Sequence, residues 1–153
     1  MKEMPAEDAL RRKMQPGAIS GGGFLGSDAR SLQEILDTDA AAIAALGLTH
    51  LQVAERLGEI VRAAMAAQGA PAEVGTGLQA VYRESRGRVP CPWADGMFDK
   101  GQVEITDTRS GETLLCTPLS VHMIAAHGFY QSRGSRYRIE PKRLRLLMSL
   151  PSQ

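Results

Sequence analysis

Four residues in the second half of the chain have side chains suited to metal binding or catalysis. They are both cysteines and two of the three histidines: Cys91, Cys116, His122 and His127. Thiolate and imidazole groups are ligands that zinc prefers. Two histidines five positions apart on a regular helix point about 140° away from each other. We therefore expect these two rings to converge only if the helix ends before His127, which Gly128 permits.

Cys91 is a candidate nucleophile as well as a candidate zinc ligand. A reactive thiolate needs a nearby cation or imidazole, which His122 or His127 would supply. Pro90 and Pro92 flank Cys91 in an extended segment. A cysteine beside prolines also suits a small buried side chain, and His127 suits a structural role at the negative end of a helix. One hypothesis is therefore a metal- or thiol-dependent enzyme that uses Cys91, His122 and His127.

Basic residues gather toward the C-terminus and form a second constellation. Residues 1–80 carry 7 Lys and Arg against 10 Asp and Glu, whereas residues 81–153 carry 11 against 7. Arginines two apart on a strand share a face and can present forked donors to phosphate or carboxylate groups. A solvated basic face without a ligand is the alternative. The residues of this predicted anion site are Arg133, Arg136, Arg138 and Arg143.

Two capping boxes predict where helices begin in the first half. Ser31 with Glu34, and Thr49 with Gln52, can each satisfy two free amides at a helix start. Apolar residues then recur at helical spacing, and glycines end both segments. The short connection predicts an αα-hairpin whose acidic residues face solvent. This hairpin is also the expected surface for a homo-oligomer, if one forms.

The second half of the chain predicts strands with a short inserted helix. Segments 102–107 and 112–117 indicate a β-hairpin, and 118–127 a helix. Segment 135–140 alternates as a third strand would, with its arginines outward, and Pro141 opens a last helix. The predicted fold class is α+β: a helical hairpin, then a small antiparallel sheet with an inserted helix and a C-terminal helix.

Length and composition place limits on the class of protein. Residues 1–26 contain two prolines and a run of three glycines, and they predict a flexible arm, which leaves 27–153 as one domain. No run approaches 18 apolar residues, so we expect no membrane span. The first twenty residues lack the apolar stretch of a secretory signal, which predicts a cytoplasmic protein with free thiols.

Three segments of the C-terminal half share a pattern with other proteins: RVPCPWADG at 88–96, PLSVHMIAAHGFY at 118–130 and GSRYRIEP at 134–141. Together they resemble a family of small bacterial proteins without an assigned activity, over about the last 65 residues. The resemblance implies a bacterial origin. It also implies a common pocket for Cys91, Trp93, His122, His127 and Arg138.

The charge distribution favours one function and the soft ligands favour another. The leading hypothesis is a cytoplasmic, non-catalytic binding module without a cofactor. Its basic C-terminal face would engage an anionic small molecule, nucleic acid or an acidic protein surface. The alternative is a metal- or thiol-dependent enzyme, with zinc as the cofactor. Metal content separates the two.

Overall fold

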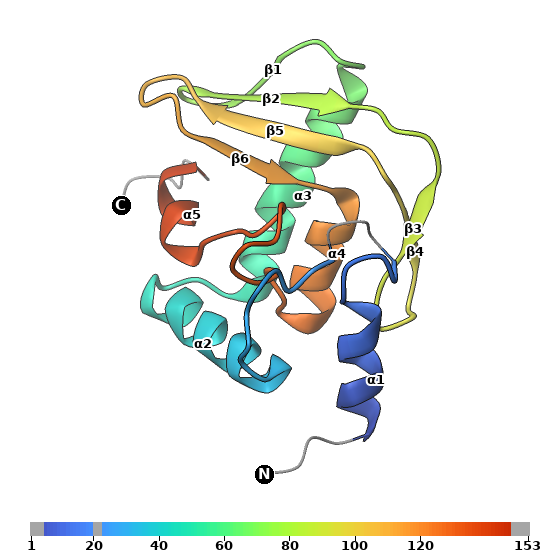
Figure 1. Cartoon of the computed structure of the whole chain (residues 1–153). Helices are drawn as coiled ribbons and strands as arrows, with labels where there is room; N and C mark the ends of the chain where they lie inside the picture. Colours follow the sequence, from blue (N-terminus) through green and yellow to red (C-terminus); the bar gives the residue numbers. More distant parts are fainter. Residues whose placement is uncertain (1–4, 20–22, 148–153) are drawn as a thin grey trace.

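The computed structural model describes residues 5–19 and 23–147 and has the predicted α+β class (Figure 1). Within these residues an antiparallel sheet is packed against helices, and a separate pair of short strands lies at its side. The helices are α1 (Pro5–Lys13), α2 (Leu32–Ala45), α3 (His50–Ala66), α4 (Pro118–His127) and α5 (Pro141–Leu147). The strands are β1 (Ala72–Gly75), β2 (Leu78–Arg83), β3 (Arg88–Pro90), β4 (Met97–Asp99), β5 (Gln102–Asp107) and β6 (Thr113–Cys116).

The main sheet has four antiparallel strands in the order β1-β2-β5-β6. The predicted hairpin of β5 and β6 is confirmed, with Val103 opposite Cys116 and Ile105 opposite Leu114. Inward-facing side chains of this sheet meet the apolar stripe of α3, which includes Val53 and Leu57, and form the larger core. The stripe is therefore covered within the chain itself.

Helix starts follow the predicted capping residues closely. Ser31, Thr49 and Thr117 each accept a hydrogen bond from the third helical residue, whose side chain bonds back to the cap. Gly128 takes the left-handed conformation (φ 62°) that ends α4. The predicted αα-hairpin implies that α2 and α3 pack mainly on each other. Instead, α3 lies mainly against α4 and the sheet, while α2 contacts α5.

Two sequence expectations about the chain termini are wrong. Residues 1–26 were expected to contain no regular structure, yet α1 occupies Pro5–Lys13, and Met14 is completely buried. Segment 135–140 forms turns rather than a strand. Its apolar member Ile139 is buried as predicted, but Arg138 points inward instead of outward. Asp39 on α2, expected in solvent, is its buried partner.

A second apolar cluster joins the N-terminal segment to α4. It includes Met14, Phe24, Cys91, Met123 and Phe129, so residues far apart in sequence share one small core. Strands β3 and β4, which the sequence did not predict, form the two-stranded sheet beside this cluster. Both cysteines are buried free thiols, as expected. None of the helices in residues 5–19 and 23–147 is long and apolar enough to cross a bilayer.

The last part of the C-terminal prediction lies partly outside the described residues. Leu144 is buried, as a core-facing residue of the predicted last helix should be. The side chains of residues 145–147 and all of residues 148–153 are not described. The expected contributions of Arg145, Leu147 and Met148 therefore fall outside the part of the chain that the structure describes.

Candidate metal centre

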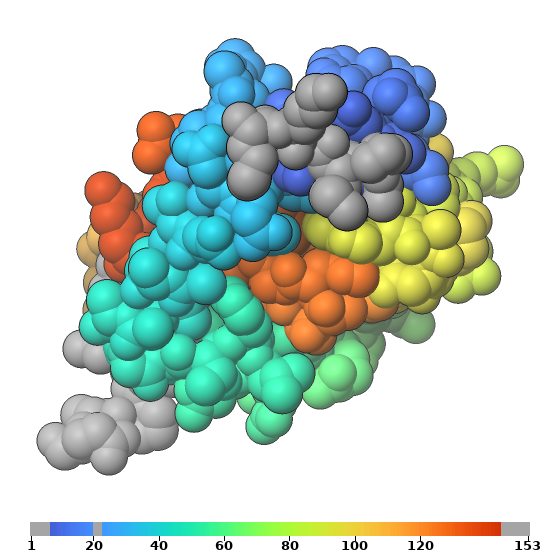
Figure 2. All heavy atoms as spheres, turned by 90° about the horizontal axis from the view of Figure 1, so that it is seen from below, coloured from blue at the N-terminus to red at the C-terminus, as the bar shows by residue number. Residues whose placement is uncertain are grey.

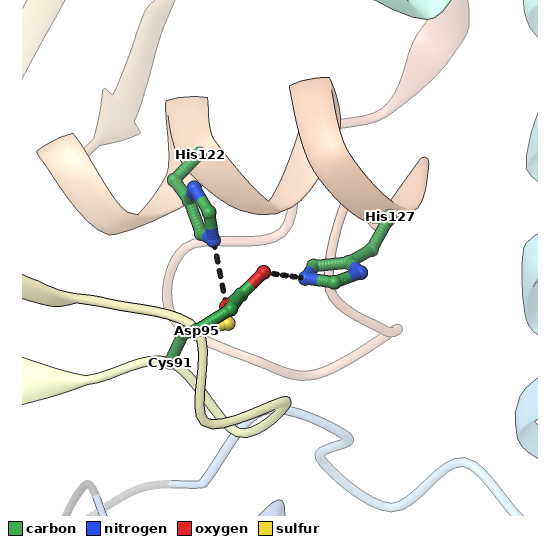
Figure 3. Close-up of side chains that lie close together, drawn as sticks. All are labelled: Cys91, Asp95, His122 and His127. Atoms are coloured by element: carbon green, nitrogen blue, oxygen red, sulfur yellow. Dashed lines mark hydrogen bonds and ion pairs between the residues drawn. The ribbon is translucent and has the colours of Figure 1, made fainter.

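A tight loop between β3 and β4 presents Cys91 and Asp95. The main-chain N–H of Cys91 donates to the carbonyl of Gly96 (3.0 Å), and Ala94 donates to the carbonyl of Cys91 (2.8 Å). Ala94 has φ 61°, a left-handed conformation that costs an L residue energy and sharpens the turn. The loop thereby holds the thiol and the carboxylate on the same side, toward α4 (Figure 3).

Helix α4 supplies the two histidines. Their ring centroids are 5.5 Å apart and the rings are nearly perpendicular. The expectation that the helix must end before His127 is wrong, because His127 is its last residue. The two imidazoles instead extend toward a common point from different turns of the helix (Figure 3). The side-chain conformations thus compensate for the angle of about 140° between the two positions on the helix.

Asp95 connects the loop to the helix. Its Oδ1 lies 2.9 Å from Nε2 of His122, and its Oδ2 lies 2.8 Å from Nε2 of His127. The thiol of Cys91 lies beside this carboxylate and lowers its pKa. One ligand atom from each of Cys91, Asp95, His122 and His127 lies within 4.8 Å of the others. The structure thus brings together three of the four candidate ligands and adds Asp95, whereas Cys116 on β6 is buried in the larger core, away from this cluster.

The thiol and the carboxylate have strongly shifted pKa values. Burial raises the pKa of Cys91 to about 12, and its hydrogen bond to Asp95 acts in the same direction. The bonds from Cys91 and His122 hold the pKa of Asp95 well below its ordinary value. A neutral thiol that is 1% exposed is a poor nucleophile. Without a metal ion, this arrangement therefore disfavours thiol catalysis.

Aromatic rings fix the orientation of both imidazoles. Trp93 stacks on His127 with centroids 4.0 Å apart and planes 9° apart. Phe98 stacks on His122 at 4.6 Å, and Phe129 meets Trp93 edge-on at 5.6 Å. Such packing restricts rotation of the rings and keeps both Nε2 atoms directed at Asp95.

The two chain segments that carry the ligands meet at the molecular surface. Figure 2 shows α4 beside the segment of β3 and β4 on one face of the molecule. The side chain of Asp95 is 38% exposed, whereas those of His122 and His127 are 21% and 16% exposed. The carboxylate is therefore the most accessible of the four groups.

Asp95 is the site residue that the sequence analysis did not assign to the metal site. Carboxylates are common in the chain, with 17 Asp and Glu, so residue type alone does not single one out. Its signal was the spacing from Cys91 within a segment containing two prolines and a glycine, which is typical of a tight loop. Two potential ligands on one tight loop are expected to lie close together.

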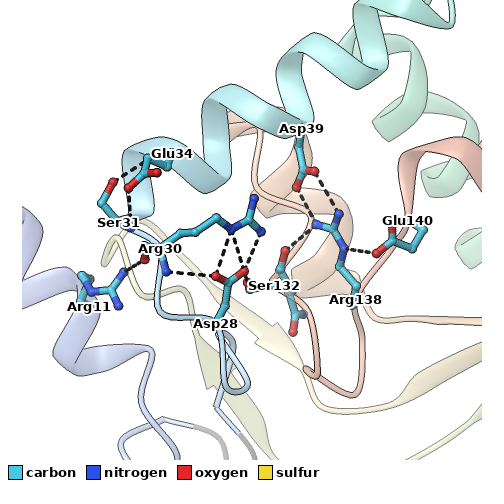
Figure 4. Close-up of polar contacts among 10 residues, drawn as sticks. Arg11, Asp28, Arg30, Ser31, Glu34, Asp39, Ser132, Arg138 and Glu140 are labelled. Carbon is cyan, nitrogen blue, oxygen red and sulfur yellow. Dashed lines mark hydrogen bonds and ion pairs between the residues drawn. The ribbon is translucent and has the colours of Figure 1, made fainter.

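Arg138, a member of the predicted anion site, is engaged inside the protein (Figure 4). Its guanidinium donates to both oxygens of Asp39 (2.5 and 2.9 Å), to Glu140 (3.1 Å) and to the carbonyl of Gln131 (2.8 Å). The side chain of Asp39 is only 6% exposed. Arg138 lowers the pKa of Glu140. The geometry gives this arginine a structural role rather than a free binding role.

The other three predicted anion-site arginines are more exposed. Arg136 donates to the side chain of Gln102 (3.3 Å), and Arg143 donates to the main-chain carbonyl of Thr113 on β6 (2.8 Å). Arg133 is exposed. Binding of an anion by Arg133, Arg136 and Arg143 stays a prediction.

Comparisons of the chain with protein families, curated proteins and solved structures found no match. The resemblance of the three C-terminal segments to bacterial proteins stays a prediction. The chemistry of the site is accordingly inferred from its own residues and their geometry.

Proposed function

We propose that the protein binds one zinc ion through Cys91, Asp95, His122 and His127. The observation that supports this most directly is the convergence of four ligand atoms within 4.8 Å. Zinc bonds of about 2.0 to 2.3 Å in a tetrahedron place ligand atoms roughly 3.3 to 3.7 Å apart. The side chains need to close by only about 1 Å to reach that arrangement.

The set of donor atoms favours zinc over other common divalent ions. Magnesium and calcium take oxygen ligands almost exclusively, and only Asp95 offers oxygen here. Thiolate and imidazole suit zinc, and one thiolate with two imidazoles and a carboxylate completes a tetrahedral shell. Binding would convert the buried thiol of Cys91 into a metal-bound thiolate.

The proposed role of the ion is to stabilise the fold. A two-stranded hairpin such as β3–β4 is marginally stable on its own in water. Zinc held by Cys91 and Asp95 on one side, and by two histidines on the other, would join this hairpin to α4. Four protein ligands leave no open position, which is typical of structural zinc sites. The proposed function is thus that of a non-catalytic metal-binding module.

The exposure of Asp95 favours a second candidate, a metal-dependent enzyme. If this carboxylate leaves the metal, Cys91, His122 and His127 remain as three protein ligands with one open position, as in catalytic zinc sites. A water molecule in that position would become the nucleophile at neutral pH. The two candidates share the same ion and differ in whether Asp95 stays bound.

Cobalt titration tests the proposal. Co²⁺ substitutes for Zn²⁺ and gives a near-ultraviolet thiolate-to-metal band when a cysteine coordinates it. We expect saturation at one ion per chain, loss of this band in Cys91→Ala, and retention in the matched control Cys116→Ala, whose thiol is also buried and free. A band that survives in Cys91→Ala, or the absence of saturable binding, would contradict the proposal.

The same sample separates the structural from the catalytic candidate. Azide binds to cobalt at an open or exchangeable position and changes the visible spectrum. A closed shell of four protein ligands predicts a spectrum that azide leaves unchanged. A saturable change on adding azide would assign the site to the catalytic candidate. In either case, the single tryptophan Trp93, stacked on His127, should report metal binding through its fluorescence.

A further inference from the structure

A pocket of about 250 Å³ lies at the N-terminal end of α4, and none of the four proposed zinc ligands lines it. Phe24, Val89 and Leu119 provide apolar walls, and Phe24 and Leu119 are almost completely buried. Thr117, the cap of α4, also lines the pocket, so the positive end of a ten-residue helix faces the same region. The pocket therefore combines an apolar body with a favourable field for negative charge.

Gln131 is a buried polar residue of the pocket that lacks a full set of partners among the described residues. It is 3% exposed, and its Oε1 accepts a hydrogen bond from Ser135 while its carbonyl accepts one from Arg138. Among the described residues, none accepts a hydrogen bond from its Nε2 or from its main-chain N–H. Buried donors are almost always paired, so an unpaired pair of donors beside a pocket indicates a missing acceptor.

The backbone of Gln131 adopts an uncommon conformation. Its φ is 63°, in the left-handed region that a non-glycine residue adopts at a cost in energy. Such strain is maintained only where the surroundings impose it, and it clusters at ligand sites. Here the bonds to Ser135 and Arg138 hold the residue in place, so both unpaired donors are fixed before any ligand arrives.

The charges around the pocket favour a singly charged anion. Lys100 and Asp99 both line it and are exposed. The carboxylate of Asp99 lies 4.0 Å from the guanidinium of Arg88, which offsets its charge. Lys100 has no such partner among the described side chains, and it adds to the positive end of α4. A multiply charged ligand such as a phosphate ester would be poorly matched to the apolar walls, because burying charge without full compensation is costly.

We propose that this pocket binds a small monocarboxylic acid. Its carboxylate accepts hydrogen bonds from Gln131 and faces Lys100, and its apolar body packs against Phe24, Val89 and Leu119. The volume of about 250 Å³ admits a body the size of one ring. The proposal does not depend on the zinc centre, because the two sites share no residue.

Benzoate and its neutral analogue benzamide test the proposal on the full chain. Both probes carry an acceptor and one ring, but only benzoate is charged. In ¹H–¹⁵N spectra, benzoate should shift the Gln131 resonances saturably at millimolar concentration, and benzamide should do so more weakly. The absence of a saturable shift at Gln131 with either probe overturns the proposal.

Two variants identify the residues responsible. Lys100→Met should weaken benzoate binding about two- to fivefold and leave benzamide binding unchanged, whereas the matched exposed control Lys142→Met should change neither. Gln131→Glu keeps the acceptor for Ser135 but replaces the donor with an acid, so it should weaken benzoate binding about tenfold or more. If Gln131→Glu does not fold, the effect of Lys100→Met on benzoate binding tests the proposal alone. Equal effects of Lys100→Met and Lys142→Met would mean nonspecific attraction and overturn the proposal.

Discussion

Asp95 is the residue on which the geometry of the candidate metal centre depends most. Each of its oxygens engages one imidazole, so this side chain orients both histidines, and the thiol of Cys91 lies beside the same carboxylate. Cys91, His122 and His127 were identifiable from residue type, because thiols and imidazoles are few in this chain. The role of Asp95 arises from the closure of a loop, which residue type does not reveal.

Replacing Asp95 tests its contribution to metal affinity. Asp95→Ala removes one of four proposed ligands, and we expect zinc affinity to fall by about tenfold or more. Asp99→Ala, in which the altered carboxylate is exposed and lies outside the cluster, is the control and should leave affinity unchanged. Competition with a chromophoric chelator measures both values. Equal affinities for the two variants would remove Asp95 from the site.

Arg138 should be essential for stability. Arg138→Met leaves the buried carboxylate of Asp39 without its partner, and breaking such a pair costs about 3 to 5 kcal/mol. The double variant Asp39→Asn with Arg138→Met should recover part of this loss. Arg133→Met, at an exposed position, should change the free energy of unfolding by less than about 0.5 kcal/mol. Urea unfolding of the four proteins compares these values, and a small effect of Arg138→Met alone would contradict the structural role.

The lowered pKa of Asp28 predicts part of the pH dependence of the free energy of unfolding. Hydrogen bonds from Arg30, with a further bond from Ser132, hold its pKa well below the ordinary value of 3.8. A carboxyl group whose pKa is depressed by folding stabilises the native state above that ordinary value, and this contribution disappears as the pH falls toward the folded pKa. The stability difference between wild type and Asp28→Asn should therefore be largest above about pH 5 and shrink as the pH falls toward 2. Urea unfolding across this pH range measures the difference, and a constant difference would contradict the assignment.

At the scale of elements, local hydrogen-bonding patterns were predictable and long-range ones were not. The caps at Ser31, Thr49 and Thr117 mark helix starts because each cap and its reciprocal partner lie three residues apart. Segment 135–140 alternates like a strand, yet no neighbouring strand pairs with it, and tertiary contacts hold it as turns. Helix α1 is only nine residues long and has few large apolar side chains, so its helical signal in the sequence was weak, and its placement depends on the second core.

The cap of α3 allows a direct test at this scale. Thr49 accepts a hydrogen bond from the main-chain N–H of Gln52, and Thr49→Ala leaves that donor without its acceptor. We expect a loss of about 0.5 to 2 kcal/mol in the free energy of unfolding. Thr38→Ala, in the exposed interior of α2, is the matched control and should not destabilise the protein, because alanine favours helix. Equal unfolding midpoints for wild type and Thr49→Ala would show that this cap contributes nothing.

At the scale of the whole molecule, the candidate site and a buried ion pair both depend on contacts between distant segments. The pair of Arg138 and Asp39 joins positions 99 residues apart, and the metal cluster joins a loop at 91–95 to a helix at 118–127. The sequence showed a basic C-terminal region. It could not reveal that Arg138 in this region forms a buried ion pair with Asp39 on α2. Composition records charge, whereas only the fold decides which charges are paired.

In the proposed holo protein, one zinc ion joins the β3–β4 loop to α4. A crystal structure of the zinc-loaded protein, with diffraction recorded on both sides of the zinc absorption edge, tests it most directly. We predict one anomalous peak about 2.0 to 2.3 Å from the ligand atoms of Cys91, Asp95, His122 and His127. The hydrogen bonds between Asp95 and the two histidines would then be replaced by bonds to the metal. A peak elsewhere, or no peak with those hydrogen bonds intact, would contradict the claim.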